Sequence, residues 1–88
     1  MQQIVQIKVD GELDLHTFKP TELASLVPEY LNACREAGIK TVRIIHGKGT
    51  GNLRRSVHSI LNRLDIVKSY KIAGHDAGHW GATVVNLK

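Results

Sequence analysis

Two stripes of apolar residues at helical spacing, each next to a run of β-forming residues, most constrain how this chain can fold. The stripes are Leu23, Leu26, Val27, Tyr30, Leu31 and Cys34, and then Leu53, Val57, Ile60, Leu61 and Leu64. Each predicts an amphipathic helix, the second over 53–64 with Asn52 as its N-cap. Because a proline inside a helix costs about 3 kcal/mol, we expect the main part of the first helix to begin at Pro28.

Short β-rich runs alternate with these helices. They cover 13–16, 41–45, 66–73 and 82–87, with 4–9 as an expected extra edge strand. The glycine-rich stretch "GHDAGHWG" separates the last two runs and favours an antiparallel pair. A strand–helix–strand alternation implies a parallel crossover. The predicted fold is therefore an α/β arrangement of the α+β sandwich type, β-α-β-α-β-β, with a mixed four-stranded sheet and two helices.

Length and composition restrict the kind of protein. The chain of 88 residues predicts one domain over 1–88, with residues 1–3 as a polar start that we expect to fray. No apolar run approaches the roughly 20 residues of a membrane span. The single Cys34 cannot form an internal disulfide, so we expect a cytoplasmic location and no membrane partner. The formal net charge of +4 favours a polyanionic partner.

The segment "VRIIHGKGTGNLRR" carries glycines 47, 49 and 51 between a strand and a helix. Such glycines can expose successive backbone N–H groups beside the positive end of the helix dipole. Arg54 and Arg55 fall in the first helical turn, where each cation opposes the dipole by about 0.3 to 1 kcal/mol. We therefore predict a bound phosphate, with a plain tight turn and solvated arginines as the alternative.

Two nucleotide-binding motifs do not match this loop. A P-loop requires Gly-Lys followed by Ser or Thr, but Lys48 is followed by Gly49. A dinucleotide-binding fingerprint requires G-x-G-x-x-G in a larger α/β domain, whereas this loop reads G-x-G-x-G. The pattern argues against both ATP and NAD.

Asp14 and His16 form the second polar constellation. In an extended segment the two side chains would share one face about 7 Å apart, while the leucines beside them face the core. A carboxylate beside a histidine can fix its tautomer or raise its basicity, which suits proton transfer in phosphodiester cleavage. An ordinary polar strand edge is the alternative for this pair taken alone.

Three segments together, "ELDLH", "VRIIHGKGTGNLR" and "GATVVNLK", resemble the small MutS-related (Smr) domain over roughly residues 12 to 88. The resemblance implies a sandwich similar to the C-terminal domain of a translation initiation factor. It also implies binding of DNA or RNA, and endonuclease activity that nicks DNA or cleaves RNA. The family pattern has glycine after L-D-L-H, where this chain has Thr17, which we expect to narrow the site.

The resemblance assigns roles to particular residues. Asp14 and His16 match the family residues implicated in cleavage. The predicted nucleic-acid contacts are His46, Gly47, Lys48, Gly49, Gly51, Arg54 and Arg55, of which Lys48 and Arg55 come from the charge pattern alone. A non-catalytic binding module of a repair or translation-quality-control protein remains the alternative function.

His58, one turn after Arg54, either extends the basic face or is simply solvated. The last two histidines and the tryptophan lie in the final glycine-rich stretch. His75 and His79 have a spacing that could hold zinc on a helix, but the glycines around them predict a loop. We expect no metal site and no cofactor, with Mg²⁺ left open for DNA nicking. Trp80 could stack on a base or pack on the sheet. Preference for DNA or RNA and the oligomeric state stay open.

Overall fold

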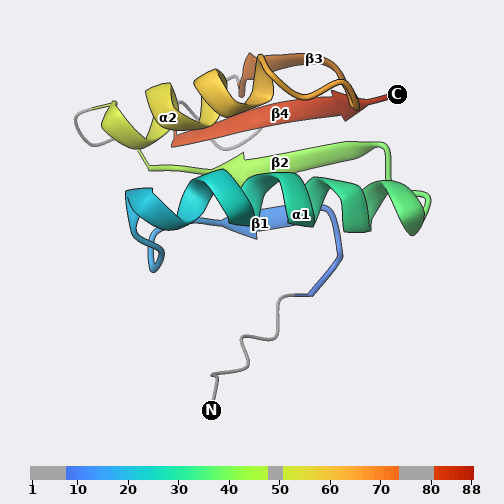
Figure 1. Ribbon diagram of the computed structural model, residues 1–88, viewed down its shortest axis with the longest axis horizontal. Helices are drawn as coiled ribbons and strands as arrows, with labels where there is room; N and C mark the ends of the chain where they lie inside the picture. Colours follow the sequence, from blue (N-terminus) through green and yellow to red (C-terminus); the bar gives the residue numbers. More distant parts are fainter. Residues whose placement is uncertain (1–7, 48–50, 74–80) are drawn as a thin grey trace.

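The computed structural model of the protein describes residues 8–47, 51–73 and 81–88. Its elements are β1 (Glu12–Asp14), the 3₁₀ turn η1 (Pro20–Glu22), α1 (Leu23–Glu36), β2 (Thr41–Ile45), α2 (Asn52–Leu61), β3 (Val67–Ile72) and β4 (Ala82–Leu87) (Figure 1). The four strands form one sheet in the order β1-β2-β4-β3. β1 and β2 are parallel, and β4 runs antiparallel to both β2 and β3. The predicted mixed sheet with two helices is confirmed.

Both helices pack on the same face of the sheet. The core joins strand residues to the buried stripes of α1 and α2: Leu13, Val42, Ile44, Val85, Leu23, Val27, Leu31, Val57 and Leu61. The opposite face carries polar residues that pair across the strands, including Arg43 with Glu12 and Asn86 with Ser69. A sheet covered on one side alternates apolar and polar residues in this way. We call this side, which neither described helix covers, the open face.

The start of α1 differs from the prediction. The helix begins at Leu23 and continues through Pro28. Leu23 and Val27 are both fully buried. Burying each such side chain contributes about 1.5 to 3 kcal/mol, which together offsets the roughly 3 kcal/mol cost of an interior proline. Packing of the first turn thus outweighs the local penalty.

The start of α2 also differs. Gly51, with a φ of 87°, occupies the N-cap position, and Asn52 is the first helical residue. The side chain of Asn52 accepts a hydrogen bond from Arg55 instead of capping the helix. The helix ends at Leu61, three residues before the predicted end, and Leu64 still packs against the core from the following turn.

The strand boundaries are close to those expected, with two corrections. The first strand ends at Asp14, so His16 lies in a turn and not on an extended strand. Residues 8 and 9 belong to no strand, and 4–7 lie outside the described residues. Beyond these, β2 and β4 have the predicted limits, and β3 is one residue shorter at each end.

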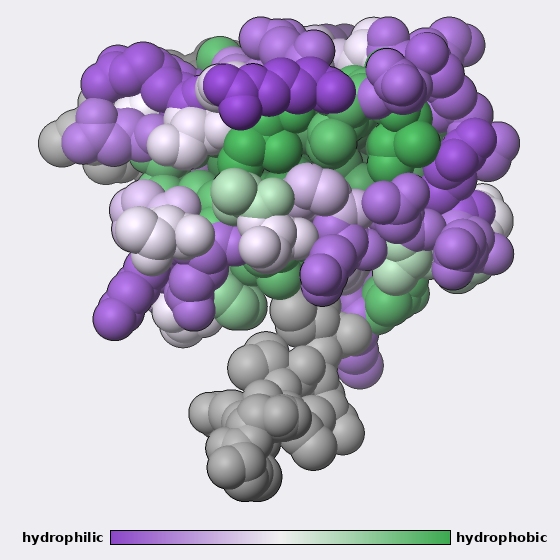
Figure 2. Space-filling view, in the orientation of Figure 1, coloured by the Kyte–Doolittle hydropathy of each residue, from purple (hydrophilic) through white to green (hydrophobic). Residues whose placement is uncertain are grey.

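Hydrophilic side chains make up most of the surface seen from the helix side, with an apolar band between them (Figure 2). Within the described ranges, no helix has the length and apolar character that crossing a membrane requires.

Candidate functional site

The segment that carries Asp14 and His16 lies beside His46 and Gly47, the start of the glycine-rich motif, at one edge of the sheet. Because β1 and β2 are parallel, their carboxyl ends lie side by side, and the Leu15 N–H donates to the Ile45 carbonyl at 2.9 Å. The N–H groups of His46 and Gly47 both donate to the Gly81 carbonyl at 2.8 Å, which adds the start of β4. We call residues 14–17, 45–47, 51–55 and 81–83 the motif edge. Ligands of open sheets commonly bind at the carboxyl ends of parallel strands.

Asp14 and His16 are in direct contact at this edge. The Asp14 Oδ1 accepts the His16 backbone N–H at 3.0 Å and lies 2.8 Å from the His16 Nδ1. The backbone hydrogen bond, followed by that of the imidazole, lowers the pKa of Asp14, which is therefore ionised at neutral pH. An ionised carboxylate only accepts, so in the neutral imidazole Nδ1 carries the proton and Nε2 carries the lone pair. The His16 side chain is 75% exposed, so this lone pair can reach a ligand.

His46 lies on the inner side of the motif edge, and its ring is buried. Its Nδ1 lies 3.1 Å from the Gly47 carbonyl, and its Nε2 lies 2.8 Å from the Thr83 hydroxyl. The same hydroxyl lies 2.9 Å from the His58 Nε2 on α2. The Thr83 hydroxyl thus links His46, which follows β2, to His58 on α2.

The hydrogen-bond partners define the tautomers in this network. A carbonyl only accepts, so the His46 Nδ1 must donate to Gly47. Neutral His46 then accepts at Nε2 from the Thr83 hydroxyl, and the Thr83 oxygen accepts from the His58 Nε2. With both rings neutral, this assignment satisfies both ring nitrogens of His46, the Thr83 hydroxyl and the His58 Nε2.

Burial keeps both rings neutral. Desolvation is the main cause that lowers the pKa of His46 and of His58, and the positive charge of Arg54 lowers both further. The His58 ring packs against Tyr70 of β3, with 4.8 Å between ring centroids. This network joins α2 to the sheet behind the motif edge.

Arg54 and Arg55 both lie at the first turn of α2. A Cβ built on Gly51 would lie 3.1 Å from the Arg54 Nη2, so this guanidinium folds back over the start of the helix. The Arg55 Nη2 donates to the Asn52 Oδ1 at 2.8 Å. No acidic residue occupies the first turn. Two cations therefore stand beside the positive end of a helix dipole, an arrangement that an anion would stabilise.

The structure sorts the predicted residues into three groups. Asp14, His16, Gly47, Gly51, Arg54 and Arg55 share the motif edge with exposed or partly exposed surfaces, except Gly51, which is buried beneath the arginines. His46 is 4% exposed, so its ring positions the loop and does not face a ligand. Lys48, Gly49, His75, His79 and Trp80 lie outside the described residues.

Sequence reasoning missed Thr83 as a member of the site and left His58 as a solvated or basic-face residue. Thr83 lies within an ordinary β-rich run, and only the register that places it opposite Ile44 reveals its role. Among the described residues, no three His, Cys, Asp or Glu side chains gather as metal ligands would.

Comparison with known proteins identifies the family. The model of the Smr domain matches residues 13–88. The chain is 41% identical over 80 residues to the endonuclease MutS2 of Clostridium tetani, covering 91% of this chain and 10% of that protein. It is 43% identical over 81 residues to the endonuclease MutS2 of Lactobacillus gasseri, again with 10% of the relative covered. The chain thus spans about a tenth of the length of these relatives.

Solved structures agree with the sequence match. The Smr domain of Thermus thermophilus MutS2 has a TM-score of 0.82 and 38% identity, and the match covers 88% of this chain and 96% of that one. YdaL, a stand-alone small MutS-related protein from Escherichia coli, has a TM-score of 0.77 and 30% identity, with 89% and 64% covered. The fold, the motifs and these matches agree, and the chain belongs to the Smr domain family.

Proposed function

We propose that this chain is a nucleic-acid-binding module of nuclease type that holds a backbone phosphate at the motif edge and cleaves beside it. The observation that carries the proposal is the Asp14–His16 pair, whose Nε2 lone pair is exposed at the same edge as Arg54. The MutS2 relatives are named endonucleases, which supports the same activity here. DNA and RNA share the phosphodiester group and are both candidate substrates.

The binding part of the proposal rests on charge and backbone geometry. Arg54 and Arg55 supply the cations, and the first N–H groups of α2 point toward the same place. Lys48 and Gly49, between the end of β2 and this helix, complete the proposed contacts. Phosphate contacts of this kind bind all sequences alike, so the module would be sequence-tolerant. The buried Cys34 thiol suits the cytoplasm that we propose as its location.

The chemical part rests on His16. On RNA, the Nε2 lone pair would accept the proton of a 2′-hydroxyl as its oxygen attacks the adjacent phosphorus. The 5′-oxygen would then leave and take a proton from water, producing a cyclic phosphate and a 5′-hydroxyl end, and His16 would release its proton to the solvent. Arg54 and the backbone N–H groups would stabilise the charge that develops on the phosphate. DNA lacks this nucleophile, so nicking of DNA would need activated water, for which Mg²⁺ is the candidate activator.

The test separates binding from cleavage. Supercoiled DNA and structured RNA are each incubated with the wild type and with His16→Ala, with Mg²⁺ and with EDTA, while fluorescence anisotropy measures affinity. We expect His16→Ala to keep its affinity within about twofold and to lose cleavage by about 10² to 10⁴, the usual contribution of a general base. Binding without cleavage by the wild type would instead support the non-catalytic module.

A further inference from the structure

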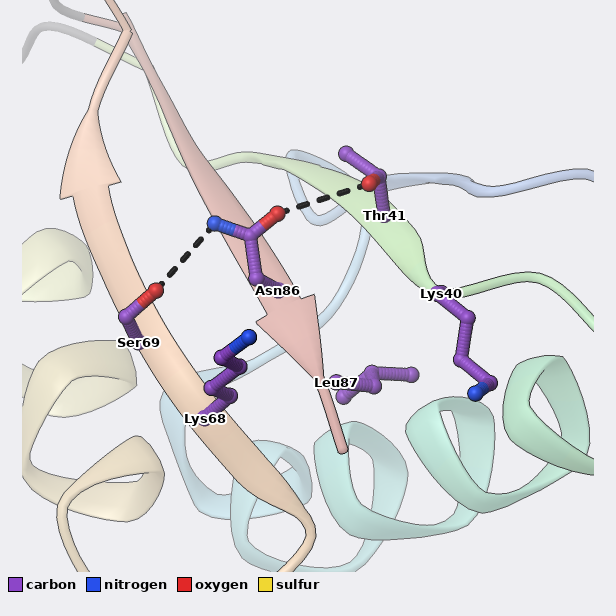
Figure 3. Close-up of a pocket in the computed structure, with 6 residues that line it drawn as sticks. All are labelled: Lys40, Thr41, Lys68, Ser69, Asn86 and Leu87. Atoms are coloured by element: carbon purple, nitrogen blue, oxygen red, sulfur yellow. Dashed lines mark hydrogen bonds between the residues drawn. The ribbon is translucent and has the colours of Figure 1, made fainter.

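A second polar site lies on the open face, at the end of the sheet opposite the motif edge. A shallow cavity of about 280 Å³ is lined by Lys40, Thr41, Lys68, Ser69, Asn86 and Leu87 (Figure 3). None of these six residues is acidic. Lys40 before β2 and Lys68 on β3 stand on either side of the end of β4. We call this cavity the lysine patch.

Hydrogen bonds across the strands orient the polar groups of the lysine patch. The Thr41 hydroxyl donates to the Asn86 Oδ1 at 3.4 Å, and the Asn86 Nδ2 donates to the Ser69 hydroxyl oxygen at 3.2 Å. Asn86 keeps one amide hydrogen, and within the described part of the chain the Ser69 hydroxyl hydrogen meets no acceptor. The ladder therefore presents donors, which match a ligand that only accepts hydrogen bonds.

A β-bulge brings Lys68 to this face. Val67 pairs with Leu87, and Ser69 pairs with Asn86, so Lys68 is an extra residue with no partner of its own on β4. A bulge bends its strand and turns the side chain of the extra residue away from regular alternation. Here it puts an ammonium group beside the hydroxyl of Ser69 on the open face.

The acidic residues of the open face are already paired. Glu12 contacts Arg43, and Asp14 contacts His16 at the motif edge. The described carboxylates of this face therefore leave the two lysines of the patch uncompensated. An anion that accepts several hydrogen bonds would fit both the charge and the donors of the patch.

We propose that the lysine patch binds a backbone phosphate of the same nucleic acid that the motif edge holds, an inference that rests on the function proposed above. β2 connects the two places, and at about 3.3 Å per residue the four steps from Thr41 to Ile45 span about 13 Å. This distance corresponds to about four nucleotides of a duplex strand, at 3.4 Å each. A helical nucleic acid lying along the open face can therefore reach both sites.

The positions of the aromatic residues bear on which part of a nucleic acid the open face would contact, the bases or the phosphate–sugar backbone. Of the aromatic side chains that the structure describes, Tyr30 is buried in the core, Phe18 packs against the core, and Tyr70 contacts His58 of α2. Base stacking needs exposed aromatic rings. None of the six residues that line the lysine patch is aromatic, so the patch offers contacts to phosphate and sugar, which add affinity without sequence preference.

The test compares the salt dependence of binding in the wild type and in charge variants. A fluorescein-labelled 16-base-pair DNA duplex and an RNA duplex of the same sequence are titrated with the wild type, with Lys40→Gln/Lys68→Gln, with Arg54→Gln, and with Arg35→Gln/Arg63→Gln. Both arginines of the last pair are exposed and match the loss of two charges: Arg63 lies in the turn after α2, and Arg35 lies on α1 and donates to the Lys88 carbonyl. Removing one phosphate contact lowers the slope of log K against log salt by about 0.9.

We expect the Lys40/Lys68 variant to lower this slope by about 1 to 2 units on both duplexes, and Lys40→Arg/Lys68→Arg to restore it. The Arg35/Arg63 control should change the slope by less than half as much. Equal slopes for the Lys40/Lys68 variant and this control would overturn the inference. Failure of the wild type to bind either duplex, or an Arg54→Gln variant that binds unchanged, would instead overturn the proposed motif-edge site.

A spectroscopic measurement covers the case in which a variant folds poorly. In ¹⁵N-labelled wild-type protein, the Asn86 side-chain amide and the Ser69 backbone amide should shift as either duplex is added. Shifts confined to residues 14–17, 45–47 and 51–55 would place the nucleic acid at the motif edge alone and would contradict the second site.

Discussion

At the scale of single residues, the Thr83 hydroxyl links the site to α2, because it is the hydrogen-bond partner of the Nε2 atoms of both His46 and His58. Thr83→Val keeps the shape of the side chain and removes both hydrogen bonds. A buried polar group left unpaired costs about 1 to 3 kcal/mol, so we expect a loss of that size in the free energy of unfolding. Urea denaturation measures this loss. As a control, Thr21→Val on the exposed turn η1 should change the free energy of unfolding by less than about 0.5 kcal/mol.

The same two histidines predict how stability depends on pH. Their pKa values are lowered in the folded state, first by burial, so below the ordinary imidazole pKa of about 6.5 the unfolded chain binds protons that the folded protein does not. Stability therefore falls as the pH drops from about 7 to 5. Asp14, whose pKa is also lowered, stabilises the folded state above the usual carboxyl pKa of about 4, and this contribution is lost only as the pH falls below that value.

NMR titration of the imidazole protons separates this prediction from other pH effects. Both rings should titrate below the ordinary value, and Arg54→Gln should raise the pKa of each, since a nearby positive charge is removed. Histidine pKa values that do not move in Arg54→Gln would show that the guanidinium lies away from the two rings.

At the scale of elements, the start of α2 depends on Gly51. Gly51→Ala imposes a left-handed φ on alanine, at a cost of about 1 to 2 kcal/mol, and puts its Cβ against the Arg54 guanidinium. Gly38, with a φ of 85° and open space around it, provides a matched control after α1. We expect both alanine variants to lose similar stability, while only Gly51→Ala weakens binding to duplex DNA. Equal affinities would argue that Arg54 does not contact the nucleic acid.

Periodicity alone predicted the type of each element but not where the helices begin. The burial of Leu23 and Val27, which offsets Pro28, depends on the sheet beneath α1 and is invisible to a local rule. Likewise, Asn52 has the side chain of a good N-cap, yet Gly51 takes this place because the chain leaves the loop with a positive φ. Tertiary packing and loop geometry decide both boundaries.

At the scale of the whole molecule, the parallel pairing of β1 and β2 explains why motifs about thirty residues apart in sequence share one edge. The strand–helix–strand order predicted this parallel pairing. The sequence could not reveal the Thr83 network or the lysine patch. Both depend on the register of β4 and on the bulge in β3, which no local pattern records.

The central claim is that His16 accepts a proton while the motif edge stabilises the phosphate, and that RNA supplies its own nucleophile. The most direct measurement uses a structured RNA with a single 2′-deoxy substitution at the scission site, in EDTA, beside the unmodified RNA. We predict that cleavage stops at the substituted position, and that the unmodified RNA yields a cyclic phosphate in a reaction that His16→Ala abolishes. Cutting at the 2′-deoxy position at an undiminished rate would contradict the account and indicate attack by water.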